Sequence, residues 1–206
     1  MREDEELFNR VLQHNSSANH RLDLTSGYLN LMDSFVKSLR KSEAEVSMLT
    51  SGPRASSFFN AGRLKRFVPF LYRAMRISLL RQMRGRRGDA PFSVFEYERD
   101  GWWFHGKGLW VYEPSKGPEG ETLRGESPCM TVVGSSNFSY RSNRRDTESQ
   151  LYVYSQCEEF NEKLKQEVDF LFSNGKPKSE KEMRNSEGMR VGLRVKLLAR
   201  LLRSFL

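Results

Sequence analysis

His105 and Lys107 form the most chemically informative pair of residues in the sequence. They lie two positions apart in Phe104-His105-Gly106-Lys107-Gly108-Leu109-Trp110, so on a β-strand both side chains would point to one face. A lysine ammonium can hold a non-bridging phosphate oxygen while an imidazole attacks phosphorus or transfers a proton. The pair therefore suits phosphoryl chemistry, although an isolated His-x-Lys is more often a strand histidine beside a surface lysine.

Two polar segments follow this pair along the chain. Gly134-Ser135-Ser136-Asn137 comes directly after the apolar run Met130–Val133, and small residues at a strand end let backbone amides approach an oxyanion. In Arg144-Arg145-Asp146-Thr147-Glu148, a carboxylate can hydrogen-bond an imidazole and fix its tautomer. Each segment alone is ordinary turn or surface sequence, but their order after His-x-Lys is more specific.

The size and composition of the chain exclude several classes of protein. Its 206 residues suffice for one ordinary domain with a buried core. Cys129 and Cys157 are the only cysteines, which excludes a disulfide framework and a zinc site of four thiolates. No apolar run reaches the length of a membrane-spanning helix, and the acidic start of the chain does not fit a signal peptide or presequence.

Basic residues are concentrated in two parts of the chain. Residues 63–87 contain nine Lys or Arg and residues 188–206 contain five, and neither stretch contains Asp or Glu. The formal net charge is +8, so the rest of the chain is net negative. This separation indicates an anionic partner, although any single basic cluster is more often a solvated face.

Hydrophobic periodicity predicts helices alternating with strands. The expected helices cover residues 4–14, 30–41, 63–83 (with Pro69 as a kink) and 158–172. The expected strands cover residues 20–28, 44–50, 92–97, 102–105, 109–112, 130–133 and 150–154. Residues 114–128 read as a polar loop. The pattern predicts an α/β domain with a mixed β-sheet flanked by helices.

The ordered set of His105-x-Lys107, Gly134-Ser135-x-Asn137 and Asp146-x-Glu148 resembles one catalytic half of the phospholipase D superfamily. More narrowly, the sequence resembles the eukaryotic mitochondrial phosphatidylglycerophosphate synthases in four segments: residues 28–30, 58–61, 104–110 and 134–142. The resemblance runs from about residue 22 to the C-terminus and corresponds to the C-terminal half of those enzymes. It implies a single phospholipase-D-like lobe.

Two departures from the superfamily pattern matter. Tyr112 stands where the pattern places an Asp, five residues after the lysine, and the synthases resembled also lack that Asp in their second motif. Superfamily enzymes build one site from two His-x-Lys motifs, whereas His14 and His20 are not followed by a lysine two residues on. The chain is therefore either a fragment of a longer protein or one partner of another chain.

The resemblance implies transfer of a phosphatidyl group from CDP-diacylglycerol to glycerol 3-phosphate, with release of CMP and without a metal or other cofactor. It makes His105 the general acid/base, with Lys107 and Asn137 holding phosphorus oxygens. Ser135 would assist in substrate binding, and Glu148 would orient the imidazole. The candidates for binding the acceptor's phosphate are Arg141, Arg144 and Arg145, because a guanidinium matches phosphate geometry.

Composition, charge and the resemblance together give the expected domain organisation and partners, and the resemblance alone gives the location. The expected segments are an N-terminal helical lead-in (1–21), a phospholipase-D-like half-domain (22–173), a linker (174–187) and a basic amphipathic C-terminal segment (188–206). The expected partners are the two substrates, an anionic membrane surface and a second His-x-Lys half-site, but not nucleic acid. That half-site would come from the missing N-terminal half or from another chain. The expected location is the mitochondrial inner membrane.

The C-terminal segment alternates at Met189–Val195, which predicts a strand leading into a helix. From Val195 onward apolar residues recur at helical spacing, with Lys196, Arg200 and Arg203 on the opposite side. This pattern is typical of an interfacial helix, but it also fits a helix that packs on the core.

Two alternative functions remain open from the sequence. A single-motif nuclease could dimerise to bring two His-x-Lys motifs together, and the basic clusters would then follow a nucleic-acid backbone. A non-catalytic product that binds anionic lipid or a partner chain is not excluded either, because half of the site is missing.

Overall fold

The computed structural model describes residues 3–58, 67–185 and 191–206. Its centre is a seven-stranded mixed sheet with the strand order β8-β7-β4-β1-β2-β3-β9. The three parallel strands at its centre are β1 (Arg21–Ser26), β2 (Glu45–Ser51) and β3 (Phe92–Tyr97). The antiparallel strands are β4 (Lys107–Tyr112), β7 (Met130–Gly134), β8 (Gln150–Tyr154) and the short edge strand β9 (Gly175–Pro177). The predicted α/β class with a mixed sheet is confirmed.

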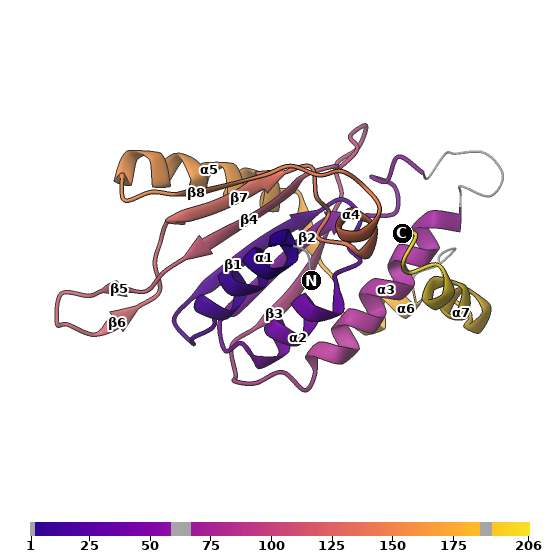
Figure 1. The fold of residues 1–206 in the computed structure, drawn as a ribbon, viewed down its shortest axis with the longest axis horizontal. Helices are drawn as coiled ribbons and strands as arrows, with labels where there is room; N and C mark the ends of the chain where they lie inside the picture. Colours follow the sequence, from indigo (N-terminus) through magenta and orange to yellow (C-terminus); the bar gives the residue numbers. More distant parts are fainter. Residues whose placement is uncertain (1–2, 59–66, 186–190) are drawn as a thin grey trace.

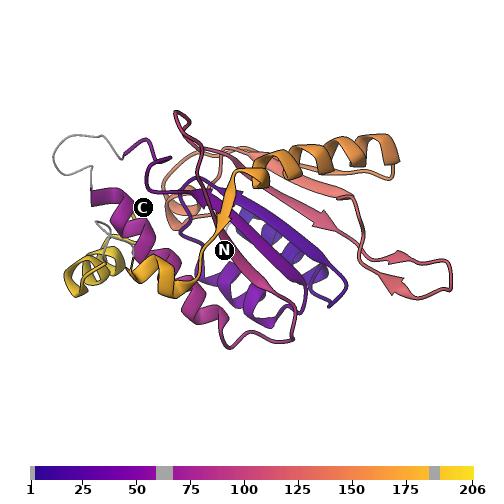
Figure 2. The same cartoon turned by 180° about the vertical axis from the view of Figure 1, so that it is seen from behind.

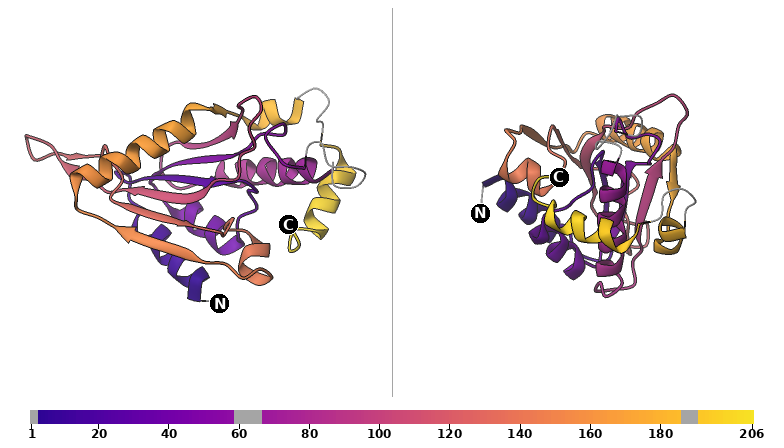
Figure 3. Two further views of the ribbon diagram at one scale, coloured as in Figure 1. Left: turned by 90° about the horizontal axis from the view of Figure 1, so that it is seen from above. Right: turned by 90° about the vertical axis from the view of Figure 1, so that its right-hand side faces the viewer.

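Helices cover both faces of the sheet. One face carries α1 (Glu3–His14) and α2 (Asp33–Lys41), and the other carries α5 (Glu158–Ser173) (Figures 1 and 2). The longest of the other helices, α3 (Val68–Met83), runs beside α2 and contributes Ile77 to the same core as α1 and α2. The shorter helices are α4 (Tyr140–Arg144), α6 (Glu180–Asn185) and α7 (Leu193–Leu201). Viewed from above, the sheet lies between α5 and the α1–α2 layer (Figure 3).

Strand β4 shows how alternation in the sequence produces these layers. Leu109 and Val111 are fully buried in the core formed with α1 and α2. Trp110 and Tyr112 point to the opposite face and pack against Leu164 and Val168 of α5. Since successive side chains of a strand point to opposite faces, one apolar run supplies both layers.

Pro69 lies in the first turn of α3 and does not kink the helix. Proline is tolerated there because the first N–H groups of a helix have no intrahelical partner. The part of the predicted helix before Phe67 lies outside the described residues.

Residues 102–105 do not form the predicted strand. Phe104 donates a backbone hydrogen bond to Ala55, and Trp102 closes a turn onto Arg99, so the segment crosses the sheet edge as an irregular loop. The predicted loop 114–128 also differs, because it contains a small hairpin of β5 (Ser115–Lys116) and β6 (Thr122–Leu123).

The segment 174–187 was expected as a linker, but its described part, residues 174–185, carries regular structure. Strand β9 pairs with β3, and Met183 of α6 is fully buried in the main core. At the C-terminus, Leu193 already begins α7, so the predicted strand does not form in the described part of 189–195. The polar composition of 174–187 misled the first prediction, and the alternation of apolar residues in 189–195 misled the second. The proposed domain boundaries stay a prediction.

Candidate active site

The candidate site lies where β1 ends and β4 begins. Ser26, the last residue of β1, pairs with Lys107, and the Gly27 amide donates to the Gly106 carbonyl at 3.0 Å. Ser26 also joins the third segment, because its hydroxyl donates to the Asn137 carbonyl at 3.1 Å and lies 3.4 Å from the Asn137 side-chain oxygen. The structure therefore brings together His105, Lys107 and Asn137, which the sequence predicted from separate segments.

His105 is exposed, and its backbone and ring contact a glycine and a tyrosine of the segment that follows β1. A Cβ added to Gly27 would lie 3.2 Å from the His105 Cα, so glycine allows the two chain segments to approach closely. The Tyr28 ring meets the imidazole edge-on, with ring centroids 5.4 Å apart. Partial burial and then the nearby Lys107 charge lower the pKa of His105. A lowered pKa favours the neutral imidazole, the form that can accept a proton.

The Lys107 ammonium donates to the His105 carbonyl at 3.0 Å. Among the described residues no carboxylate lies within ion-pair distance of it. Burial lowers the pKa of Lys107, and the Glu148 charge partly opposes that shift. This cation is thus available to an anion that enters the site.

The loop that carries Asn137 is fixed by short backbone contacts. The Ser135 amide donates to the Ser149 carbonyl at 3.0 Å, and the Ser149 amide donates back to the Ser135 hydroxyl, also at 3.0 Å. At Gly134 a Cβ would lie 2.1 Å from the Ser149 carbonyl oxygen, so only glycine fits. Phe138 adopts φ 55° and is buried, with its ring stacked on Phe8 at 4.5 Å.

Glu148, the predicted partner of the imidazole, lies near Lys107. No hydrogen bond joins it to His105 in the described part of the chain; its charge acts on Lys107 instead. It lines a small cavity of about 20 Å³ with Ser136 and Asn143. Its role in orienting the imidazole stays a prediction.

The three candidate arginines are exposed, and each contacts another part of the chain. Arg141 pairs with Asp146 at 3.0 Å, and Arg144 pairs with Glu5 of α1 at 3.3 Å. Arg145 donates to the Ser204 carbonyl at 2.9 Å and stacks over Phe205. Arg144 and Arg145 therefore hold the two ends of the chain. Arg141 also acts electrostatically on Tyr72, whose ring stacks on Tyr28 beside His105.

Three further residues at the site, Ser26, Gly27 and Tyr72, were not predicted from the sequence. The Ser-Gly pair at the end of a strand is the same signal that singled out Gly134-Ser135, and it could have identified Ser26. Tyr72 gives no such signal because only the packing of α3 on the sheet brings it beside Tyr28.

Two arginines of the first basic stretch turn inward beneath the site. Arg76 donates to Glu96 at 3.0 Å and to the Ser51 carbonyl, and Arg73 lies 3.5 Å from the same carboxylate. All three charged groups are almost completely buried. The Ser51 hydroxyl donates to the Gly27 carbonyl at 2.7 Å, so this buried cluster supports the backbone behind His105.

Comparison with known proteins identifies one group of relatives. The mitochondrial CDP-diacylglycerol–glycerol-3-phosphate 3-phosphatidyltransferase of Cricetulus griseus is 29% identical over 202 residues, 98% of this chain and 34% of the relative. The enzyme of the same name from Gallus gallus is 30% identical over 169 residues, 82% of this chain and 28% of the relative. The Saccharomyces cerevisiae enzyme is 28% identical over 86% of this chain and 35% of the relative. The chain thus spans about a third of their length.

Solved structures agree on the fold, while no family model matches the sequence. Phosphatidylserine synthase of Haemophilus influenzae superposes with a TM-score of 0.75 at 15% identity, covering 99% of this chain and 45% of that one. A phospholipase D family member from Salmonella typhimurium gives 0.50 at 12% identity, covering 84% of this chain and 90% of that one. The chain is a homologue of the CDP-diacylglycerol–glycerol-3-phosphate 3-phosphatidyltransferases and has the phospholipase D fold.

Proposed function

We propose that this chain supplies one half of the active site of a phosphatidyltransferase that uses CDP-diacylglycerol and glycerol 3-phosphate. The meeting of His105, Lys107 and Asn137 around Ser26 carries the proposal. The names of the relatives supply the two substrates. The product would be phosphatidylglycerophosphate, and CMP would leave.

Two steps account for the transfer. A histidine of the other half-site attacks the phosphatidyl phosphorus, forming a P–N bond while the P–O bond to CMP breaks. The glycerol 3-phosphate hydroxyl then attacks phosphorus, the P–N bond breaks, and His105 accepts the hydroxyl proton. CMP leaves as a phosphate with a second pKa of about 6 and needs little protonation. The hydroxyl is a poor nucleophile, so we assign the larger part of the effect of His105, about 10²–10⁴-fold, to the second step.

Lys107 and Asn137 fit the role of holding the phosphorus oxygens. The ammonium has no carboxylate partner within ion-pair distance in the described part of the chain, so an incoming phosphate would not have to displace one. Asn137 is held by Ser26 on its backbone and side-chain oxygens, which leaves its amide nitrogen to donate. Donors fixed in advance stabilise developing charge without reorganisation.

The second half-site is the necessary partner. His105 is exposed and directly precedes β4, whose first residue pairs with the last residue of β1. This open position leaves room for a second lobe to face it. A first-motif half from the same longer protein is the favoured source, because the chain spans about a third of its relatives.

Helix α7 is proposed to contact an anionic membrane. In the described chain, no helix has the length and apolarity needed to cross a bilayer. Exposed leucines form a row on α7 at Leu193, Leu197 and Leu201, while Val195 and Leu202 pack towards α3. Of the stripe predicted from the sequence, Val195 and Leu202 therefore pack against the core, whereas Leu198 and Phe205 are exposed. The relatives named mitochondrial support a location at a mitochondrial membrane, and we propose the inner one.

CMP release from CDP-diacylglycerol and glycerol 3-phosphate tests the proposal. The 206-residue chain alone is expected to show no turnover, whereas the two-motif enzyme, made by combining it with the first-motif half of a homologous synthase, should be active. Robust turnover by a monomer of this chain would contradict the half-site proposal. Turnover by its dimer would assign the second half-site to another copy.

A further inference from the structure

A cavity of about 160 Å³ lies between α3 and α7, apart from the His105 site. Figure 3 shows α7 crossing α3 at this place. Leu29, Leu31 and Ile77 contribute to its apolar wall. Four cationic side chains and no carboxylate line it among the described residues: Arg81, Lys196, Arg200 and Arg203. An apolar wall with a cationic rim suits an anion that carries a hydrocarbon part.

The four cations are not equally available. Arg81 pairs with Glu180 at 2.7 Å, and Arg203 pairs with Asp33 at 2.8 Å. Lys196 and Arg200 have no ion pair within the described ranges. They are four residues apart on α7, so they lie on one face of the helix, at the cavity. Two neighbouring cations of this kind match the charge and donor geometry of a phosphate.

The volume of the cavity indicates which chemical group a phosphate-containing ligand would place in it. An apolar cavity of about 150 Å³ accommodates benzene, so this one has room for about six carbon atoms. A free phosphate on the rim would leave that apolar volume empty. A phospholipid would fill both parts. The exposed row Leu193, Leu197 and Leu201 lies next to Lys196 and Arg200 around α7, so a bilayer contacting the leucines would present lipid phosphates at the rim.

We propose that this cavity binds one anionic phospholipid, with its phosphate on Lys196 and Arg200 and the first part of an acyl chain between α3 and α7. The inference rests on the proposed membrane contact but not on the transferase activity. It also suggests a route to the active site. Leu29 and Asn30 line the cavity, and the preceding residue, Tyr28, contacts the His105 ring. An occupied cavity would therefore fix the segment behind the imidazole.

Calorimetric titration of the 206-residue chain with monomeric dihexanoyl phosphatidic acid tests the proposal without requiring turnover. We expect Lys196→Gln with Arg200→Gln to weaken binding at least about tenfold, since each removes a charge-assisted contact. Ser78→Phe should weaken it too, because Ser78 lines the cavity and is exposed. The matched control is Arg194→Gln, an exposed cation of the same helix that does not line the cavity; it should leave binding unchanged.

Three results would overturn the proposal. Equal binding of dihexanoyl phosphatidylcholine would remove the requirement for an anion. Equal binding of inorganic phosphate would reduce the site to one for free anions. A loss of binding in Lys107→Met would place the lipid at the His105 site instead. Thermal unfolding of each variant verifies that it is folded. If Ser78→Phe does not fold, Arg200→Gln alone, at an exposed position, still tests the proposal.

Discussion

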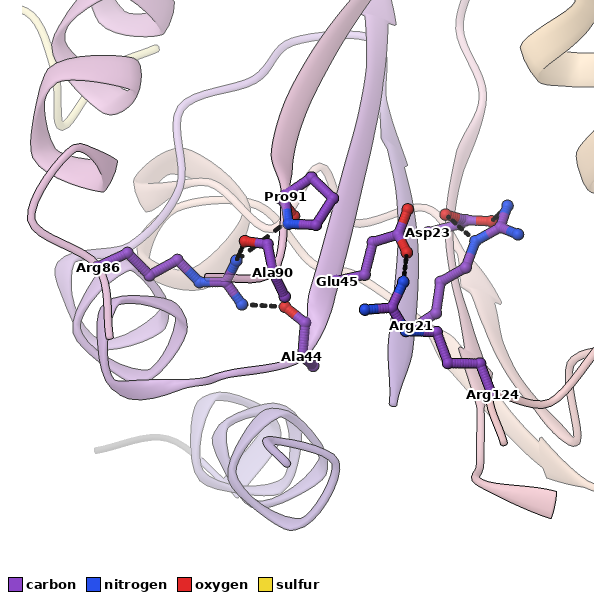
Figure 4. A network of polar contacts seen from close by, with 8 residues as sticks. All are labelled: Arg21, Asp23, Ala44, Glu45, Arg86, Ala90, Pro91 and Arg124. Atoms are coloured by element: carbon purple, nitrogen blue, oxygen red, sulfur yellow. Dashed lines mark hydrogen bonds and ion pairs between the residues drawn. The ribbon is translucent and has the colours of Figure 1, made fainter. Parts of the chain in front are cut away.

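The two ends of the central sheet differ in how many partners their cationic side chains have. Where β1, β2 and β3 begin, Arg86 donates to the carbonyls of Ala44 and Ala90, Arg21 pairs with Asp23, and Arg124 pairs with Glu45 (Figure 4). Where the strands end, Lys107 donates to one carbonyl and has no ion pair in the described chain.

This difference separates a structural use of charge from a chemical one. A guanidinium saturated by carbonyls and carboxylates fixes loops but offers nothing to a ligand. Keeping a partly buried ammonium charged without a carboxylate costs free energy, and the lowered pKa of Lys107 reflects that cost. An anion that binds beside it therefore stabilises the charged form strongly. Arg76 shows that position alone is not enough, because it lies beneath the site yet is buried and ion-paired with Glu96.

Replacing His105 should produce the largest effect. His105→Ala in the two-motif enzyme is expected to lower CMP release by about 10²–10⁴-fold or more, because the proton acceptor for the glycerol hydroxyl is lost. Arg124→Gln, at the other end of the sheet, serves as the control and should keep full activity. If His105→Ala kept more than half of the activity, the assignment of the active site would be wrong.

Breaking the buried cluster should mainly reduce stability. Glu96→Gln leaves two buried guanidiniums without their carboxylate and is expected to lower the free energy of unfolding by about 3–5 kcal/mol. Urea denaturation of the 206-residue chain measures this. Glu98→Gln is the matched control, since Glu98 pairs with Lys176 and Lys178 at the surface and should contribute less than about 1 kcal/mol. Similar losses in both variants would contradict the distinction between buried and surface pairs.

The leucine row of α7 should contribute a smaller effect on membrane binding. Leu197→Asn with Leu201→Asn is expected to weaken binding to cardiolipin-containing vesicles at least about tenfold, because apolar area no longer enters the bilayer. Leu151→Asn, at another exposed leucine, is the control. Co-sedimentation at two salt concentrations measures the apolar and the electrostatic contributions to membrane binding. Binding that is unchanged by the α7 substitutions would rule out this helix as the anchor.

The smallest predicted effect is a shift in the titration of His105. The neighbouring Lys107 charge lowers the pKa of His105, so Lys107→Met should raise it towards the ordinary value. NMR titration of the imidazole reports this shift directly. The acidic limb of the activity profile of the two-motif enzyme should move to higher pH, since the base must be neutral to accept a proton. An unchanged or lower His105 pKa in Lys107→Met would contradict the effect assigned to the Lys107 charge.

The sequence predicted the helices and strands around the site but not the contacts between segments that lie far apart in the chain. β8 and α5 match their predicted ranges because alternation and helical spacing are local signals. The convergence of His105 and Asn137 on Ser26 depends on strand order, which no local pattern contains. The roles of Arg144 and Arg145 at the chain ends were missed for the same reason, since their partners lie far away in sequence.

The stacking of Phe8 on Phe138 has a consequence for how the protein folds. The contact closes a loop of 130 residues and holds the backbone next to Asn137 in a left-handed conformation that a bulky residue adopts only under constraint. Contacts between such distant positions form late, because the entropy of closing the loop must be overcome first. The loop that carries Asn137 is therefore expected to be completed only when α1 docks, and a chain that begins after His14 would collapse around its sheet without ordering this loop.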